Sequence, residues 1–205
     1  LVRKYPHLHV MSDDIYEHIT FDNFKFTTLA TVAPDIKDRI FIVNGVSKAY
    51  SMTGWRIGYG AGPEKLIKAM SMIQSQSTSS PSSISQAASV EALNGNQDYI
   101  QQGKKIFQER RNLVVSMLNK IEGIECNQPN GAFYVFPDVS AFFGKTLKGY
   151  KIENAGDFSM FLLEEANVAT VTGDAFGAPT CLRMSYAASE AQLREAIARI
   201  KKAVS

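Results

Sequence analysis

Short apolar runs and longer segments of helical periodicity alternate along the first half of the chain. Residues 7–11, 39–43 and 55–61 have the length and pattern of strands, and a helical pattern follows over residues 63–73. Pro63 suits the first turn of that helix, where its missing N–H costs no hydrogen bond. Strands separated by helices in this way are typical of a parallel sheet, so we expect an α/β fold.

A long helical pattern lies near the middle of the chain. Residues 83–93 predict one helix and residues 98–121 a second, with Asn94-Gly95-Asn96 as a break between them. The apolar residues of the second helix recur at roughly helical spacing, as in a helix packed on a core: Ile100, Ile106, Val114, Val115 and Leu118. We expect this helix to join two domains.

Beyond residue 121 the pattern becomes that of an α+β domain. We expect strands at 124–126, 132–136 and 182–186, a helix at 155–166 and a closing helix after Ser189. The pair Asn130-Gly131 lies between two β-like runs and indicates a tight hairpin. Ser189 and Gln192, three residues apart, form a capping box for the closing helix.

Composition excludes several classes of protein. The chain has 205 residues, of which 45% are hydrophobic and 20% charged, as is typical of a globular protein. A net charge of +2 gives no strong field for nucleic acid or anionic lipid, and no apolar run is long enough to span a membrane. The basic residues Lys104, Lys105, Arg110 and Arg111 are interleaved with other types, so we expect a solvated helix face.

Three further patterns point away from metal, redox and dinucleotide chemistry. Cys126 and Cys181 are far apart in sequence and match no CxxC pattern, so we expect free thiols in a reducing compartment, the cytoplasm. His7 and His9 share one strand face but lack a third ligand nearby, so we expect no metal site. The glycine-rich residues 58–62 are followed by a proline where a dinucleotide loop requires its third glycine.

The most informative chemistry lies in residues 44–59, where Lys48 and Arg56 are set in a Gly- and Ser-rich loop between two β-like runs. Such a loop at a strand end is where open α/β sheets place ligands. A partly desolvated lysine can form a Schiff base with an aldehyde, whereas arginine binds a phosphate through parallel hydrogen bonds. Pyridoxal 5'-phosphate (PLP) carries an aldehyde and a phosphate on one small ring, so both groups suit this cofactor.

Residues 47–63, SKAYSMTGWRIGYGAGP, resemble the lysine signature of class I and II aminotransferases, the fold-type I PLP enzymes. Residues 12–17 (SDDIYE) resemble the D-E-I-Y element of that family, and residues 183–186 (RMSY) resemble its R-x-S-Y element. Residues 76–81 and 129–134 look most like the bacterial aspartate aminotransferase branch. The similarity runs through essentially the whole chain.

The resemblance also implies a division into domains. Residues 1–100 would be the C-terminal part of the large PLP-binding domain, with its mainly parallel sheet, and residues 101–205 the linking helix and the small α+β domain. Family chains are longer, and Leu1 lies in what looks like the tail of a helix, so we expect a C-terminal fragment. Such a fragment lacks part of the family's site, and we expect it to have little or no activity alone.

The resemblance assigns the cofactor roles residue by residue. Lys48 would form the Schiff base and, once freed, act as general base and acid on the substrate Cα proton. Arg56 would bind the phosphate. Many relatives have a hydroxyl residue three positions before the lysine, where this chain has Gly45, so Ser47 or a backbone N–H would take that part.

Three more residues receive roles from the same resemblance. Asp13 would contact the pyridine nitrogen and keep it protonated, which makes the ring a better electron sink. Tyr16 would donate its phenolic proton to the ring oxygen O3'. Arg183 would clamp the substrate α-carboxylate from the small domain, with domain closure over the substrate. Asp14 stands where the family usually has Glu, a departure that we regard as peripheral.

The predicted function is transfer of an amino group between an amino acid, aspartate or glutamate, and a 2-oxo acid by a ping-pong route. A cytoplasmic homodimer without nucleic-acid or membrane partners is implied. Aromatic amino acids and prephenate remain possible substrates, because the same branch includes enzymes for them. Three alternatives stay open: a PLP-dependent C–S β-lyase, an aminotransferase-like effector domain of a transcription regulator, and an inactive remnant.

Overall fold

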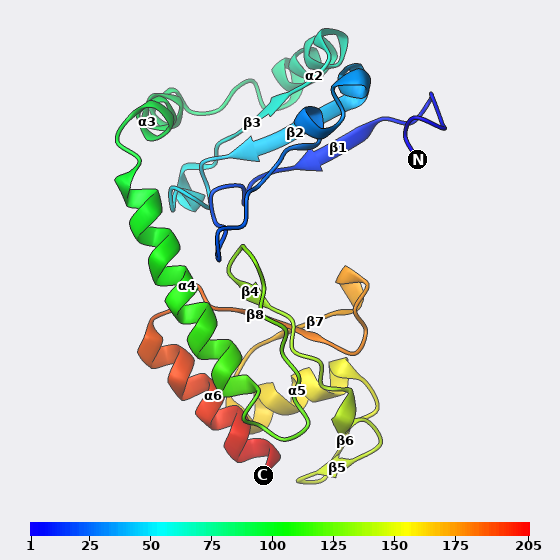
Figure 1. Cartoon of the computed structure of the whole chain (residues 1–205), viewed down its shortest axis with the longest axis vertical. Helices are drawn as coiled ribbons and strands as arrows, with labels where there is room; N and C mark the ends of the chain where they lie inside the picture. Colours follow the sequence, from blue (N-terminus) through cyan, green and yellow to red (C-terminus); the bar gives the residue numbers. More distant parts are fainter. The chain divides into compact units, whose positions relative to one another are not determined.

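The computed structural model describes residues 1–205, which form two compact units, 1–104 and 105–205. The first unit contains a three-stranded sheet in the order β1 (Val10–Asp13), β2 (Ile40–Gly45), β3 (Gly58–Ala61) (Figure 1). Strand β1 is parallel to β2, but β3 is antiparallel to β2. Residues 55–61, which we expected to be a strand of a parallel sheet, are therefore antiparallel to their neighbour.

The direction of β3 has a simple physical reason. A parallel neighbour needs a crossover connection that carries the chain back along the sheet, usually a helix. The connection between β2 and β3 contains only the short 3-10 turn η2 (Thr53–Trp55), so the chain re-enters the sheet at the edge where it left. The sequence pattern could not reveal this, because strand periodicity is the same in both directions.

Helices complete the first unit. Its short helices α1 (Leu29–Val32) and η1 (Pro34–Arg39) lead into β2, and Ala33, Ile36 and Ile40 form a small core there. The predicted helices at 63–73 and 83–93 are present as α2 (Glu64–Ser77) and α3 (Ser83–Asn94), with Pro63 as the N-cap of α2. The chain begins with a turn in which the Tyr5 N–H donates to the Leu1 carbonyl at 3.2 Å, and the expected helix tail at Leu1 stays a prediction.

The predicted long helix is present as α4 (Asp98–Leu118), which begins in the first unit and continues into the second. Its apolar pattern is confirmed at four of the five named positions, which are buried, but Ile106 is 45% exposed. Arg111 is fully buried, so the expectation of a solvated basic face is wrong at this residue. None of the helices of the structure is both long enough and apolar enough to cross a membrane.

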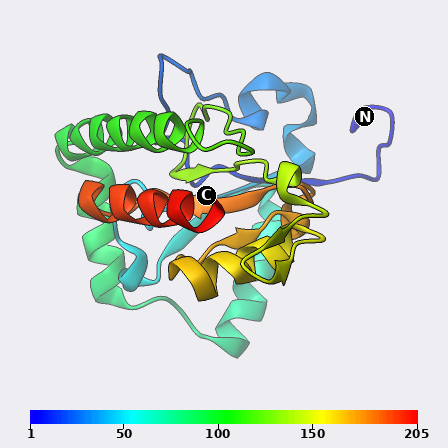
Figure 2. The same ribbon diagram turned by 90° about the horizontal axis from the view of Figure 1, so that it is seen from below.

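In the second unit, a small antiparallel sheet lies beside helices (Figure 2). The sheet has the order β4, β8, β7, and the helices α5 and α6 pack on each other. The bounds are β4 Tyr134–Val135, β5 Thr146–Leu147, β6 Tyr150–Lys151, α5 Ala155–Ala166, β7 Val171–Thr172, η3 Ser140–Phe142, η4 Asp174–Phe176, β8 Leu182–Ser185 and α6 Glu190–Val204. Strands β5 and β6 form a separate hairpin.

Local sequence patterns predicted the two helices of this unit correctly. The predicted helix at 155–166 is confirmed as α5, and α6 follows the predicted capping box. The Ser189 hydroxyl accepts from the Gln192 N–H at 3.3 Å, and the Gln192 side chain accepts from the Ser189 N–H at 3.1 Å.

Both cysteines are free thiols as expected, and burial together with Cys181 raises the pKa of Cys126 to about 11.

The expected hairpin at Asn130-Gly131 is wrong. Strand β4 pairs with β8 instead, and the residue in the left-handed conformation is Ala132, with φ 59°. Tertiary hydrogen bonds hold this segment: the Tyr186 hydroxyl donates to the Ala132 carbonyl at 3.0 Å, and Arg111 donates to the Pro129 carbonyl at 2.8 Å. These bonds come from residues distant in sequence, which a turn signal does not include.

Asp138 links three extended segments of the second unit through backbone pairing and side-chain hydrogen bonds. Its backbone is paired with Glu125 on one side and with Cys181 on the other. Its carboxylate accepts hydrogen bonds from the Ser140 hydroxyl at 2.6 Å, the Ser140 N–H at 2.8 Å and the Thr180 hydroxyl at 2.6 Å. Burial raises the pKa of Asp138, but these hydrogen bonds outweigh it and leave the pKa below the ordinary 3.8.

A depressed carboxyl pKa contributes stability above the ordinary pKa, and that stability is lost as the pH falls through the folded value. We therefore expect Asp138→Asn to lower the free energy of unfolding at neutral pH by roughly 1–3 kcal/mol. The deficit should shrink as the pH is lowered below about 4. Urea unfolding at several pH values measures it.

A matched control is Asp174→Asn, which changes an exposed carboxylate that accepts no hydrogen bond. We expect this control to leave stability almost unchanged at every pH. If Asp138→Asn lowers the free energy of unfolding by the same amount at every pH, the charge of the Asp138 carboxylate does not stabilise the fold as we expect.

Candidate functional site

Five of the six predicted site residues belong to segments that meet at one edge of the first unit's sheet. Strands β1 and β2 are parallel, so both end at this edge, β1 with Asp13 and β2 just before Ser47 and Lys48. Strand β3 is antiparallel and begins there, directly after Arg56 and Ile57. The reversed strand direction, which the sequence did not predict, is what brings Arg56 to the edge where Lys48 lies.

Asp13 and Asp14 have different environments at the end of β1. Asp13 is exposed, and its carboxylate accepts from the Ile15 N–H at 3.2 Å. Asp14 is only 6% exposed; it accepts from the Ser12 hydroxyl at 2.7 Å, and its N–H donates to the Val43 carbonyl at 2.9 Å. Asp13 is thus open to a ligand, whereas Asp14 secures the turn that carries the half-buried Tyr16.

Lys48 is held in a well-anchored loop. Val46 and Ala49 on either side are buried, and Lys48 itself is half-buried. The Tyr50 hydroxyl donates to the Gln97 side chain at 3.0 Å, and the Tyr99 hydroxyl donates to the Ser51 hydroxyl at 2.9 Å. The loop is therefore tied to the residues that begin α4, which fixes the backbone that carries Lys48.

Arg56 has an unusual backbone conformation. Its φ of 52° places it in the left-handed region, which few residues other than glycine adopt. Its guanidinium is exposed and donates to the Thr53 carbonyl at 2.7 Å, folding back over the 3-10 turn. Strained backbone of this kind, held by the surrounding structure, is often found at ligand sites.

A second group of residues at the same edge was not among the predicted site residues. The Asn44 amide donates to the Glu17 carboxylate at 2.6 Å, and its oxygen accepts from the Gly45 N–H at 2.7 Å. Glu17 therefore links the turn after β1 to the end of β2. Burial and the nearby Glu17 charge raise the pKa of Tyr50 and of Tyr59 above the ordinary value. Only a position just beyond a strand distinguishes Glu17 in the sequence.

Arg183, the sixth predicted site residue, belongs to the second unit. It lies on β8 and is half-buried. Its guanidinium carbon is 4.7 Å from the centre of the Tyr134 ring and 4.3 Å from the centre of the Phe176 ring. No hydrogen bond or ion pair engages it within the structure.

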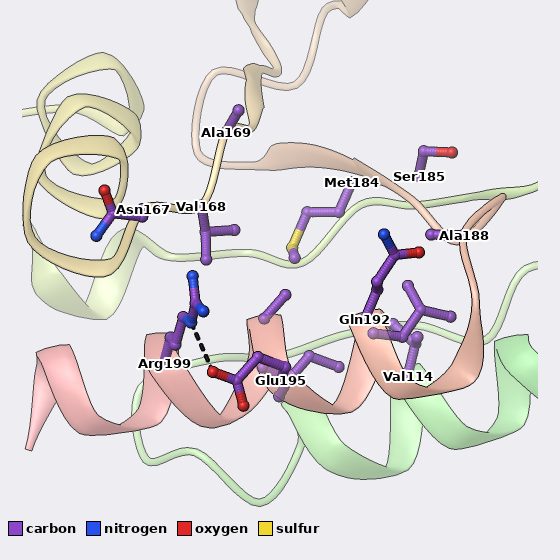
Figure 3. A pocket seen from close by; sticks show the side chains of 13 residues that line it. Val114, Asn167, Val168, Ala169, Met184, Ser185, Ala188, Gln192, Glu195 and Arg199 are labelled. Atoms are coloured by element: carbon purple, nitrogen blue, oxygen red, sulfur yellow. Dashed lines mark hydrogen bonds and ion pairs between the residues drawn. The ribbon is translucent and has the colours of Figure 1, made fainter.

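The second unit also contains a cavity of about 390 Å³ between α4, α6, β8 and the segment after α5 (Figure 3). Its lining includes Arg199, whose Nε donates to the Glu195 carboxylate at 2.8 Å. Met184 and Ser185 of β8 line the cavity, whereas Arg183 does not. None of the predicted site residues lines this cavity, so we do not place the reaction there.

A sequence profile described as "Aminotransferase class I and II" matches residues 1–200, and the chain belongs to this family. Members of this family depend on PLP. Among curated proteins, the chain is 61% identical to a probable aspartate/prephenate aminotransferase of Rickettsia typhi, over 98% of this chain and 51% of that protein. It is 55% identical to an aspartate aminotransferase of Rhizobium meliloti, over 98% of this chain and 49% of that protein.

Solved structures agree with the sequence comparison. The crystal structure of the Rhizobium meliloti aspartate aminotransferase matches with a TM-score of 0.95 and 53% identity, over 98% of this chain and 50% of that chain. The aromatic aminotransferase of Pyrococcus horikoshii OT3 matches with a TM-score of 0.88 and 34% identity, over 98% of this chain and 52% of that chain. The predicted family and fold class are confirmed, and the chain spans about half the length of these relatives.

Gly45 lies where the backbones of β2 and β3 approach each other closely. A Cβ at Gly45 would lie 3.1 Å from the Ile57 carbonyl oxygen and 3.2 Å from the Gly58 Cα. Both atoms belong to backbone of the paired β3 strand end, which cannot yield as a flexible side chain would. The close approach of β2 and β3 therefore favours glycine.

We expect Gly45→Ala to lower the free energy of unfolding by about 1–3 kcal/mol through overpacking. Gly54→Ala in the same loop is the matched control, since a Cβ there meets no atom within 4 Å. The control should change stability by less than about 0.5 kcal/mol. Urea unfolding compares the two, and equal effects would argue against a close contact at Gly45.

Proposed function

We propose that this chain is the part of a PLP-dependent aminotransferase that carries the cofactor-binding lysine and a substrate-binding arginine. The observation that carries the proposal is the meeting of an amine, a guanidinium and a carboxylate at one sheet edge, from Lys48, Arg56 and Asp13. This donor set fits a cofactor with an aldehyde, a phosphate and a basic ring nitrogen. The names of the relatives support the same activity.

Each residue at the edge has a proposed part. Arg56 and Ser47 would hold the phosphate, Lys48 would bind the aldehyde carbon, and Tyr16 would donate to the ring oxygen. The Asp13 carboxylate would keep the ring nitrogen protonated, because a nearby negative charge favours the charged form. When bound, PLP supplies an electron sink for the negative charge left on the substrate Cα. Lys48 would remove the Cα proton and return it as general base and acid.

The proposed substrates are an amino acid, aspartate or glutamate, and a 2-oxo acid. Arg183 would bind the α-carboxylate through parallel hydrogen bonds, which suits a guanidinium with unengaged donors. The relatives named for aspartate and for aspartate/prephenate support this class of substrate. We further propose a homodimer, as the family resemblance implies, and the cytoplasm, which suits two free thiols.

The test is borohydride reduction of the full-length protein after incubation with PLP, followed by peptide mapping. We expect a phosphopyridoxyl label on Lys48. The Lys48→Ala variant should lose the label and lower transamination by at least about 10²–10⁴-fold, the usual contribution of a general base.

The control is Lys68→Ala, which removes an exposed lysine paired with Glu64 on α2. This variant should keep both the label and the activity. Labelling of a different lysine, or no labelling of the unaltered protein, would overturn the proposed function.

A further inference from the structure

Two aromatic rings contact the guanidinium of Arg183 in the second unit. Its carbon lies 4.7 Å from the ring centre of Tyr134 and 4.3 Å from that of Phe176, within the range of cation–π attraction. Further aromatic rings pack against both Tyr134 and Phe176. Phe133 lies 4.8 Å from Tyr134, and Phe136 meets Phe176 edge-on at 5.6 Å.

Three separate segments build this arrangement. Arg183 lies on the central strand β8, where it pairs with Val171 of β7. Tyr134 of β4 is opposite Ser185, two residues beyond Arg183 and therefore on the same sheet face, at a diagonal within reach of a long side chain. Phe176 ends the 3-10 turn that follows β7. The sheet register thus determines which ring meets the arginine.

The other arginines of this unit show what is distinctive about Arg183. Arg194 and Arg199 pair with Glu190 and Glu195 one helical turn away, at 2.7 and 2.8 Å. Arg111 is fully buried and donates to protein oxygens. Arg110 lies 5.9 Å from the centre of the Phe107 ring and likewise has no hydrogen bond or ion pair. Arg183 differs from it in contacting two rings, both closer than 5 Å, while its donors take part in no hydrogen bond or ion pair within the structure.

Contact with rings restrains a guanidinium without using its donors. The five N–H groups lie in the plane of the guanidinium, whereas a cation–π contact is made with the face of an aromatic ring. A protein carboxylate in the same place would orient the arginine but would also occupy its donors and neutralise its charge. The rings leave the charge and the donors for a ligand.

We infer that Tyr134 and Phe176 are positioning residues that hold Arg183 ready for a planar carboxylate. The inference rests on the proposed function, in which Arg183 binds the substrate α-carboxylate. Because the rings reduce the rotamer freedom that the arginine would otherwise lose on binding, they raise affinity without touching the reacting atoms. They act on substrate binding rather than on proton transfer.

The experiment uses the full-length protein loaded with PLP and two readouts. Calorimetry measures the Kd of succinate, a dicarboxylate that cannot react, and steady-state kinetics measures KM and kcat for L-aspartate with 2-oxoglutarate. For Phe176→Leu and Tyr134→Leu we expect Kd and KM to rise about 3- to 30-fold, the range of a lost cation–π contact, with kcat changed less than KM.

Conservative variants separate positioning from packing. Phe176→Trp and Tyr134→Phe keep an aromatic face and should hold Kd and KM close to those of the unaltered protein. Phe143→Leu, at a half-buried phenylalanine of the same unit with no ring contact, should also have no effect. Borohydride labelling of Lys48 and the thermal unfolding midpoint show that each variant is folded and loaded.

The outcomes distinguish this inference from the function on which it rests. If Arg183→Leu abolishes succinate binding while Phe176→Leu and Tyr134→Leu leave Kd and KM unchanged, the positioning role is wrong and the proposed function stands. Equal losses in Phe176→Leu and Phe176→Trp would also overturn the positioning role, because a ring face would then be irrelevant. If the unaltered protein neither binds succinate nor transfers an amino group, or if Arg183→Leu binds succinate normally, the proposed role of Arg183 fails.

Discussion

The antiparallel pairing of β2 with β3 is the constraint on which the candidate cofactor site depends. The chain leaves the sheet after Gly45 and re-enters at Gly58, its partner in the ladder, so both ends of one loop are fixed at the same edge. Lys48 lies near the start of that loop and Arg56 near its end. Backbone hydrogen bonds of a sheet, rather than any contact between the two cations, therefore hold these like charges in one region.

Local sequence signals predicted those features that local interactions determine. The capping box at Ser189, the helix α5 and the Lys48 to Arg56 spacing are each decided within a few residues, and each could be read from the sequence. Strand direction was missed because side-chain alternation is the same in parallel and antiparallel strands. The expected hairpin at Asn130-Gly131 failed because Tyr186 and Arg111, both distant in sequence, bind the backbone of that segment.

Arginine shows most clearly why the candidate site could be predicted only in part. Arg56 bends back to a carbonyl of its own turn, Arg111 is buried among hydrogen-bond acceptors, and Arg183 contacts two aromatic rings. The same residue type thus stabilises a turn at Arg56, forms buried hydrogen bonds at Arg111 and is proposed to bind a ligand at Arg183. Motif resemblance distinguished Arg56 and Arg183. The expectation for Arg111 came from the interleaving of basic residues with other types along one segment, and it was wrong because burial depends on the tertiary fold.

The close contact at Gly45 also limits how this chain can evolve. A serine or threonine at this position would place its Cβ against the Ile57 carbonyl and the Gly58 Cα before its hydroxyl could serve any ligand. We therefore expect such a substitution to cost stability unless the β3 strand end shifts by a few tenths of an ångström. The backbone of β3 thus limits which side chains position 45 can carry, and a proposed phosphate contact is more readily supplied by Ser47 or a backbone N–H nearby.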